Sequence, residues 1–239
     1  MKCLAIITAR GGSKRIPRKN IRNFLGKPII AYSIESAIKS NVFDEVMVST
    51  DDDEIAEIAR KYGAKVPFKR SVETSNDTAT TTDVIIEVLN EYKKRGIIFD
   101  YACCIYPTAP FITVESLKSG LDKMLETSTE AAIPVVKYSY PIQRALEIDS
   151  EGKLSMLYPE HSRSRSQDLR SCFHDAGQFY WFKVSAIKPD MELLKMKASP
   201  IVIPETQVQD IDTKEDWSIA EMKYKMTVKE QKNRNKDKI

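Results

Sequence analysis

The chain has only two histidines and four cysteines among its 239 residues. His161 and His174 have no partner at metal-ligand spacing, and no recognisable Ser/His/Asp order accompanies them, which disfavours nucleophilic catalysis. The cysteines show no C-x-x-C spacing, and three of them, Cys3, Cys103 and Cys104, lie in apolar runs. We therefore expect buried thiols rather than disulfides or a zinc site.

Long apolar segments are also missing, so the sequence offers no membrane span and no membrane partner. The N-terminus shows no signal-type apolar stretch followed by a small-residue cleavage site, and we expect a cytoplasmic protein. A chain that is 42% hydrophobic and 30% charged is typical of globular proteins. We predict a single domain over residues 1–224, followed by a basic, disordered tail at 225–239.

Positive charge is concentrated at one end of the chain. The first 34 residues contain eight Lys or Arg and no Asp or Glu, whereas the whole chain carries a net charge of only +3. These cations follow the apolar run Leu4–Ile7 and surround Gly11 and Gly12, which allow backbone N–H groups to approach an anion. One cationic loop favours a triphosphate over a nucleic acid, and a solvated basic loop is the simpler alternative.

That loop matches neither of the two common phosphate-binding motifs. It contains no G-x-x-x-x-G-K-[ST] and no G-x-G-x-x-G, so neither a P-loop nor a dinucleotide fingerprint is present.

Short apolar runs alternate with segments of helical periodicity. They predict strands at 2–8, 45–49, 101–105 and 131–136, and hence an α/β fold with a doubly wound, mostly parallel sheet. Between the strands, one helix is expected to start at Asp51 and Asp52 and to end at Gly63, and another to run from about 79 to 95 with a box-like start formed by Thr80 and Asp83. Such sheets bind ligands at the carboxyl ends of their strands. From 137 to 175 the alternation lapses, which indicates a small insertion that completes the substrate site or docks on a second subunit; a plain surface hairpin is the alternative.

Asp210 and Asp212 are the strongest metal-ligand candidates. Two acids one residue apart point the same way from an extended strand, and their carboxylates suit Mg²⁺ with phosphate oxygens as further ligands. Alternatively, Asp212 or Thr213 caps the next helix, since Thr213 and Asp216 have capping-box spacing. For the acids at 51–53, which follow a strand end, helix capping is favoured over metal binding.

Several motifs together resemble the nucleotide-sugar cytidylyltransferases that activate nine-carbon acidic sugars as CMP conjugates. They are TARGGSKRIPRKN, STDDDEIAEIA, YPTAP and the Asp-Ile-Asp-Thr segment, and the resemblance extends to about Tyr224. PIQRAL, RSQDL, HDAGQFYW and VQDIDTKEDW most resemble the branch of the family that uses pseudaminic acid. The resemblance implies a Rossmann-like nucleotidyltransferase fold.

The resemblance also implies a role for individual residues. Arg10 and Lys14 would bind the triphosphate and, with Asp212, act in catalysis; Asp210 and Asp212 would hold Mg²⁺. The rest of the nucleotide site would consist of Ala9, Gly11, Gly12, Ser13 and Asn20, with Arg70 and Thr81 near the cytosine and ribose. The sugar-binding candidates are Tyr106, Gln143, Arg144, Arg165, Gln167, His174 and Gln178. Tyr106 departs from the sialic acid enzymes, which carry Gln at that position.

The implied activity is transfer of CMP from CTP to the anomeric hydroxyl of a nonulosonic acid, with release of pyrophosphate. CTP, the acidic sugar and a second copy of the chain would be its partners, and Mg²⁺ its cofactor. Two alternatives are the same reaction on legionaminic or N-acetylneuraminic acid, and a nucleotide-sensing protein of the same fold. No strong general base is evident, and Asp212 is one option.

Overall fold

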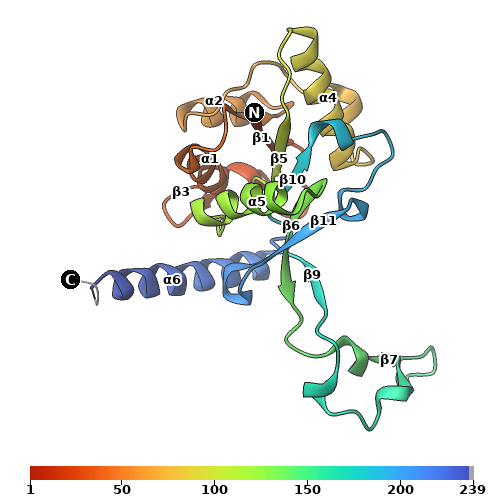
Figure 1. Cartoon of the computed structure of the whole chain (residues 1–239). Coiled ribbons are helices and arrows are strands. Elements are labelled where there is room, and N and C mark those ends of the chain that lie inside the picture. Colours follow the sequence, from red (N-terminus) through yellow and green to blue (C-terminus); the bar gives the residue numbers. More distant parts are fainter. Residues whose placement is uncertain (237–239) are drawn as a thin grey trace.

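The computed structural model describes residues 1–236, with side chains to residue 229 (Figure 1). The strands are β1 (Cys3–Thr8), β2 (Asn23–Phe24), β3 (Lys27–Pro28), β4 (Glu45–Ser49), β5 (Tyr101–Ile105), β6 (Ala131–Lys137), β7 (Leu146–Ile148), β8 (Leu154–Met156), β9 (Phe173–Asp175), β10 (Phe179–Lys183) and β11 (Ala198–Val202). The helices are α1 (Ile29–Ser40), α2 (Asp53–Lys61), α3 (Val72–Ser75), α4 (Thr81–Lys94), α5 (Val114–Thr127) and α6 (Lys214–Lys236).

The central sheet has the order β11-β6-β10-β5-β1-β4, with β9 paired to β6. β1 lies parallel to both β4 and β5, while β9 and β10 run antiparallel to their neighbours. The prediction of a mostly parallel α/β sheet is confirmed, and each of the four predicted strands agrees within one residue at either end. Since the chain moves from β4 to β5 across β1, the order reverses there, and a ligand site is expected where β1 and β5 end.

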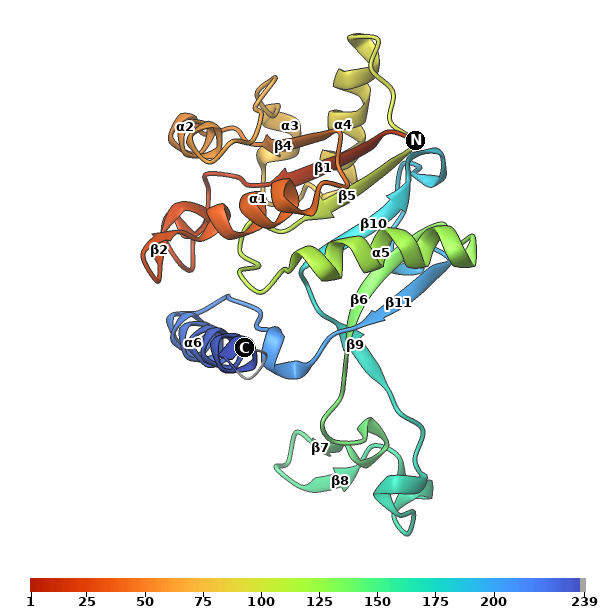
Figure 2. The same cartoon turned by 60° about the vertical axis from the view of Figure 1, so that its left-hand side comes forward.

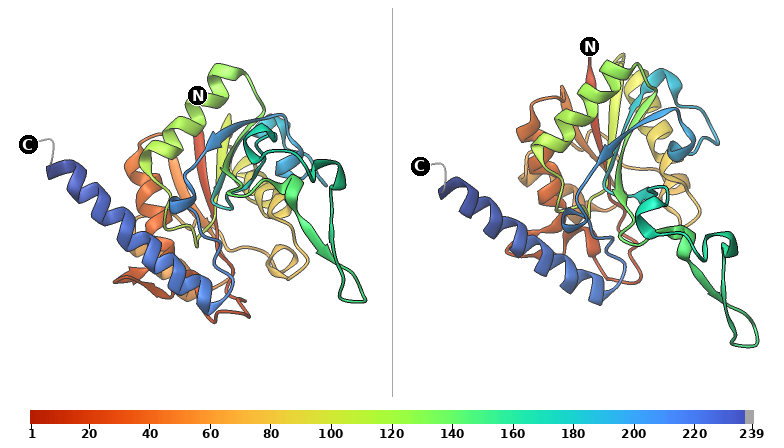
Figure 3. Two further views of the ribbon diagram at one scale, coloured as in Figure 1. Left: turned by 90° about the horizontal axis from the view of Figure 1, so that it is seen from below. Right: turned by 60° about the horizontal axis from the view of Figure 1, so that its bottom comes forward.

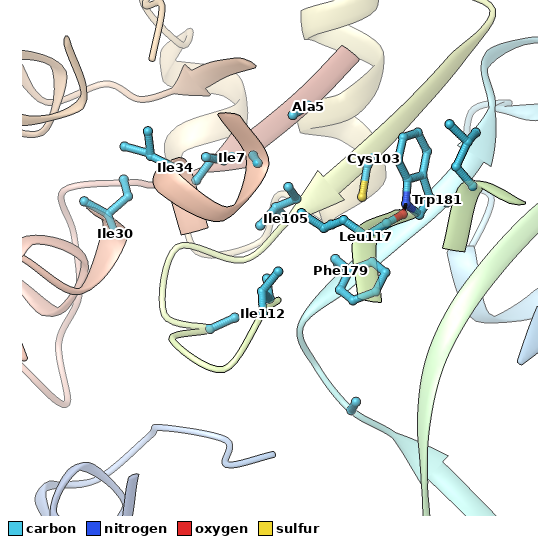
Figure 4. Close-up of a cluster of buried hydrophobic side chains, with 14 of the residues drawn as sticks. Ala5, Ile7, Ile30, Ile34, Cys103, Ile105, Ile112, Leu117, Phe179 and Trp181 are labelled. Atoms are coloured by element: carbon cyan, nitrogen blue, oxygen red, sulfur yellow. Dashed lines mark hydrogen bonds between the residues drawn. The ribbon is translucent and has the colours of Figure 1, made fainter. Parts of the chain in front are cut away.

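Helices cover both faces of the sheet. Along β1 the side chains alternate between two cores: Ala5 and Ile7 pack with α1, α2 and α5, while Leu4 and Ile6 pack with α4 (Figure 4 shows part of the first core). This two-residue alternation between fully buried faces explains why the strand reads as a continuous apolar run. It also holds the end of β1, and the loop that follows it, in a fixed place.

The predicted helix boundaries at α2 and α4 are confirmed. Asp52 caps α2 by accepting a hydrogen bond from the Ile55 N–H, and Gly63 follows the helix with a φ of +94°. Thr80 and Asp83 form a capping box at the start of α4. The edge strand β11 was not predicted; its sequence ASPIV contains Pro200, which a strand at the edge of a sheet can accommodate.

Gly120 lets α5 lie close to the sheet. A Cβ atom at this position would lie 2.6 Å from Trp181 Cδ1 and 3.0 Å from Ile201 Cδ1, and Trp181 is fully buried and stacked on Phe43. We expect Gly120→Ala to lower the free energy of unfolding by about 1–3 kcal/mol through overpacking, less any gain in helix propensity. Urea unfolding measures this, with Ser119→Ala on the exposed face of α5 as the control. Equal stability of the two variants would contradict the expectation.

The segment between β6 and β9 projects from the sheet as an arm, residues 138–172, that carries the β7–β8 hairpin (Figures 1 and 2). β6 and β9 pair antiparallel at its base, with Lys137 opposite Phe173. Among the residues whose side chains are described, none in the arm is buried. The arm therefore has no core of its own.

The other projecting element is α6, a single helix that leads away from the sheet (Figure 3). Where the sequence predicts a disordered tail from residue 225, α6 instead continues to Lys236. Residues 237–239 lie outside the described part of the chain. No helix among the described residues combines the length and apolar character needed to cross a bilayer.

Candidate functional site

A cationic cavity of about 440 Å³ opens where β1 and β5 end. Its lining comes from the loop after β1, from the loop after β5 and from the α3–α4 connection: Thr8, Arg10, Ser13, Lys14, Arg15, Lys19, Asn20, Asp77, Tyr106, Pro107 and Thr108. Four of the predicted nucleotide-binding residues, Arg10, Ser13, Lys14 and Asn20, are therefore brought together. Ala9, Gly11 and Gly12 belong to the same loop but do not line the cavity.

Hydrogen bonds within the protein hold the loop after β1 in place. The Gly11 N–H donates to Asp51 Oδ1 at 3.0 Å, and a Cβ at Gly11 would lie 2.7 Å from Asp52 Oδ2, so glycine is needed for this close approach. The buried Asn20 amide donates to the Arg10 carbonyl at 2.9 Å. The expectation that the paired glycines present N–H groups to an anion needs correction at Gly11, whose N–H is already used within the protein.

Arg18 clamps the loop to the start of α2. It has a left-handed φ of 56°, and its guanidinium donates to Asp52 Oδ2 at 2.5 Å, to Asp52 Oδ1 at 2.9 Å and to Glu54. The Arg18 hydrogen bond is the main reason why the pKa of Asp52 falls to about 2. Asp52 is thus a helix cap and loop anchor, in agreement with the favoured interpretation.

The cations around the cavity are divided between two carboxylates. Arg10 and Lys14 both contact Asp77, at 2.6 and 2.5 Å, while Arg15 and Lys19 contact Asp212, at 2.8 and 3.4 Å. Sequence reasoning missed Asp77. Its only signal was a polar Asn-Asp-Thr turn ahead of a predicted helix, which does not reveal that it faces a loop 63 residues away.

Asp210 and Asp212 do not point the same way from an extended strand, although the sequence predicts that they do. Residues 208–213 form no strand, and Val208 and Ile211, three residues apart, are the buried positions. Asp212 reaches the cations of the loop after β1, whereas Asp210 lines a separate cavity of about 360 Å³ with His174 and others. Among the described side chains, no three His, Cys, Asp or Glu groups are close enough to hold a metal ion.

The capping alternative, which named Asp212 or Thr213, is confirmed for Thr213 and not for Asp212. Thr213 and Asp216 form the capping box at the start of α6, with the Thr213 N–H donating to Asp216 at 2.8 Å and the Asp216 N–H donating to Thr213 Oγ1 at 3.1 Å. Asp212 contributes only its backbone N–H to this cap, at 3.1 Å from Asp216. Its carboxylate remains directed to Arg15 and Lys19.

Tyr106 separates the cationic cavity from a second cavity of about 450 Å³. The second cavity is lined by residues 80–83, Tyr106, Asp175, Tyr180 and residues 190–194. Its lining includes four acids, Asp83, Asp175, Asp190 and Glu192, and no Lys or Arg. The Tyr180 hydroxyl donates to Asp175 at 2.5 Å, and burial raises the pKa of this tyrosine. The two adjoining cavities thus have opposite charge.

The remaining candidates are dispersed. Thr81 lines the acidic cavity, and Arg70 is buried, donating to the Ser49 hydroxyl and carbonyl at 3.0 and 2.7 Å; burial lowers its pKa. Gln178 is buried, with its amide nitrogen bonded to the Gln207 carbonyl at 2.7 Å, and its Oε1 has no partner among the described residues. The arm carries Gln143, Arg144, Arg165 and Gln167, none of which lines these cavities of the same chain.

Fold and site together define an α/β protein with a cationic cavity beside an acidic one, at the edge of the sheet where β1 and β5 end. The family model for cytidylyltransferases matches residues 4–197. The pseudaminic acid cytidylyltransferase of Campylobacter jejuni subsp. jejuni serotype O:2 is 44% identical over 226 residues, covering 95% of this chain and 97% of that protein. The chain belongs to the cytidylyltransferase family and is a nucleotidyltransferase.

More distant relatives are named for other acidic sugars. A CMP-N,N'-diacetyllegionaminic acid synthase of Legionella pneumophila is 31% identical, covering 92% of this chain and 95% of that protein. The solved structure of a CMP:2-keto-3-deoxy-manno-octonic acid synthetase complexed with CTP matches with a TM-score of 0.69 at 18% identity, covering 96% of this chain and all of that one. At that identity the match establishes the fold alone.

Proposed function

We propose that this enzyme transfers CMP from CTP to the anomeric hydroxyl of pseudaminic acid and releases pyrophosphate. The observation that carries the proposal is 44% identity to a pseudaminic acid cytidylyltransferase over nearly the full length of both chains. The hydroxyl oxygen attacks the α-phosphorus, the bond to pyrophosphate breaks, and the hydroxyl loses its proton.

The cationic cavity is the proposed triphosphate site. Arg10 and Lys14 reach it from the loop after β1, and Ser13 lies between them in sequence. Charged donors held at fixed positions neutralise negative charge on phosphoryl oxygens and stabilise the transition state without reorganisation. We place the cytosine and ribose near Arg70 and Thr81, as the family resemblance implies. Because Thr81 also lines the acidic cavity, the nucleoside would lie at the Thr81 side of that cavity, next to the sugar.

The opposite charges of the two cavities orient the sugar. A sugar carboxylate is repelled by the acidic cavity and attracted by the cationic one, so the carboxylated anomeric end would lie at the Tyr106 boundary, near the α-phosphorus. Acids such as Asp175, with the apolar Met191 and Leu193 beside them, suit the amide N–H, hydroxyl and methyl groups at the other end. Tyr106 is the residue we expect to contact both substrates.

A divalent cation, which we propose to be Mg²⁺, fits this site only with substrate present. Carboxylates are the hard oxygen ligands that Mg²⁺ takes, but Asp210 and Asp212 have no third acidic partner among the described residues. Asp212 contacts Arg15 and Lys19, which line the cationic cavity, so phosphate oxygens and water would complete the ligand set. Once bound, the metal would neutralise charge on the phosphates.

A pyrophosphate-release assay tests the sugar assignment. We expect kcat/KM for pseudaminic acid to exceed the values for legionaminic and N-acetylneuraminic acids by about 10² or more, because the wrong stereoisomer leaves buried polar groups unpaired. Reactions without sugar are the control. A preference for either other acid would overturn the sugar assignment alone, and no release with any of them would overturn the transferase.

We also propose that the enzyme is a homodimer joined through the arm. Tyr140, Leu146, Ile148 and Leu154 in the arm expose more than half of their surface, with Tyr140 at 85%, which an isolated hairpin does not sustain in water. Arg144 and Arg165 lie too far out to line their own chain's cavities, so the partner's sugar site is the proposed destination. Light scattering should give the mass of two chains; a fully active monomer would contradict the proposal.

A cytoplasmic location is also proposed. The cysteines of the described residues are free thiols, as is usual in the reducing cytoplasm, and the proposed reaction uses CTP.

A further inference from the structure

We propose that Asp77 is a positioning residue that holds Arg10 and Lys14 in place for the triphosphate. Asp77 Oδ1 accepts from Arg10 at 2.6 Å, and Asp77 Oδ2 accepts from Lys14 at 2.5 Å. Both carboxylate oxygens are thus directed to the two cations of the proposed triphosphate site, and Asp77 lines the same cavity. The inference rests on the proposed function, because it assigns a task at that site.

The turn that carries Asp77 is built to keep its carboxylate in one place. Asn76 Oδ1 accepts from the N–H groups of Thr78 and Ala79, at 2.9 and 2.8 Å, and its amide donates to the Glu73 carbonyl at 2.8 Å. The Asn76 carbonyl in turn accepts from Arg10 at 3.1 Å. A carboxylate on such a turn restricts the rotamers of the two long side chains that it binds, which lowers the entropy lost when they bind phosphate.

The contacts leave both cations able to bind an anion. Arg10 uses Nη1 for Asp77 and for the Asn76 carbonyl, which leaves the N–H groups on Nη2 and Nε to face a phosphate. Lys14 uses one of its three N–H donors. Asp77 and the triphosphate can therefore hold the same two side chains at once.

Stability does not explain these ion pairs. The side chain of Lys14 is 78% exposed and that of Asp77 is 51% exposed, and ion pairs between exposed groups contribute little to folding. The hydrogen bonds from Lys14 and Arg10 lower the pKa of Asp77, so the carboxylate is charged at neutral pH. Its clearest physical effect is on the orientation of the two cations.

The test is the dissociation constant for CTP, measured by calorimetry on the full chain without sugar. We expect Asp77→Asn to raise this constant about tenfold, with the KM for the sugar unchanged, because the amide no longer orients the two cations. Glu73→Gln is the matched control: it removes one negative charge from the same segment, and Glu73 makes no ion pair with any residue that the structure describes. We expect that control to stay within about twofold of the wild type.

A double-mutant cycle separates positioning from a general structural effect. In the Lys14→Ala background, Asp77→Asn should weaken CTP binding by less than it does in the wild type, because one of its two partners is gone. Unchanged or tighter binding by Asp77→Asn, or strictly additive effects in the cycle, would overturn the role of Asp77. A wild-type chain that does not bind CTP at all would instead overturn the proposed function, and this inference with it.

Discussion

Lys14→Ala is expected to lower kcat/KM for CTP by about 10²–10⁴. Lys14 lies in the loop after β1 and lines the cationic cavity, where its ammonium group would meet a phosphate rather than bulk water. Folding should be unaffected, because the side chain is 78% exposed and contributes nothing to the core. Steady-state pyrophosphate release with varied CTP measures the loss.

Lys27→Ala is the matched control for Lys14. Lys27 belongs to the same cationic stretch of sequence, but it pairs with Glu35 at 2.9 Å and does not line the cavity. Both variants lose one positive charge, so long-range attraction of CTP falls similarly in each. If the Lys14 variant kept at least half of the wild-type kcat/KM, its proposed role would be wrong.

The second large effect is expected at the carboxylates after β11. Asp212→Asn should lower kcat/KM by about 10² or more and raise the Mg²⁺ concentration needed for half-maximal activity, because an amide oxygen is a neutral and poorer ligand for a hard cation. Asp210 lines a different cavity, so we expect a smaller change in the same direction for Asp210→Asn. Activity measured over a Mg²⁺ titration, with chelator as the zero point, reports both effects.

Glu215→Gln provides the comparison for Asp212. It removes one acid from the first turn of α6, beside the capping box, and among the described residues Glu215 forms no ion pair with the cationic loop. Mg²⁺ curves for Asp212→Asn that overlay those of the wild type would exclude Asp212 as a ligand. Its contact with Arg15 and Lys19 would then be its whole function.

The sequence was informative where local chemistry decides the outcome. The strands at 45–49 and 101–105 were predicted at their observed bounds, because buried parallel strands read as unbroken apolar runs. The capping boxes at Thr80 and Thr213 are local patterns too, since each is closed by an acid three residues on. The cationic loop after β1 could likewise be placed at the ligand edge of the sheet.

Those parts of the site that depend on contacts across the fold could not be predicted from the sequence. Nothing local to Asp77 indicates that it will meet Arg10 and Lys14, because the α3–α4 connection approaches them only once the sheet has formed. The spacing of Asp210 and Asp212 predicts that both side chains lie on one face of a strand. Burial of Val208 and Ile211 instead orients the segment so that Asp212 contacts the cationic loop and Asp210 lines a separate cavity. Tertiary packing overrode the two-residue period there.

The chain enters the arm from β6 and leaves it through β9 at directly opposed positions, Lys137 and Phe173. A segment whose two ends are already paired can change in length or sequence without altering the spacing of the sheet that carries it. The arm can therefore vary in length and sequence while the fold of the sheet stays the same. In the proposed dimer, changes in this one insertion would alter the subunit contacts and the arginines offered to a neighbouring copy, while the loops after β1 and β5 would keep the proposed nucleotide site.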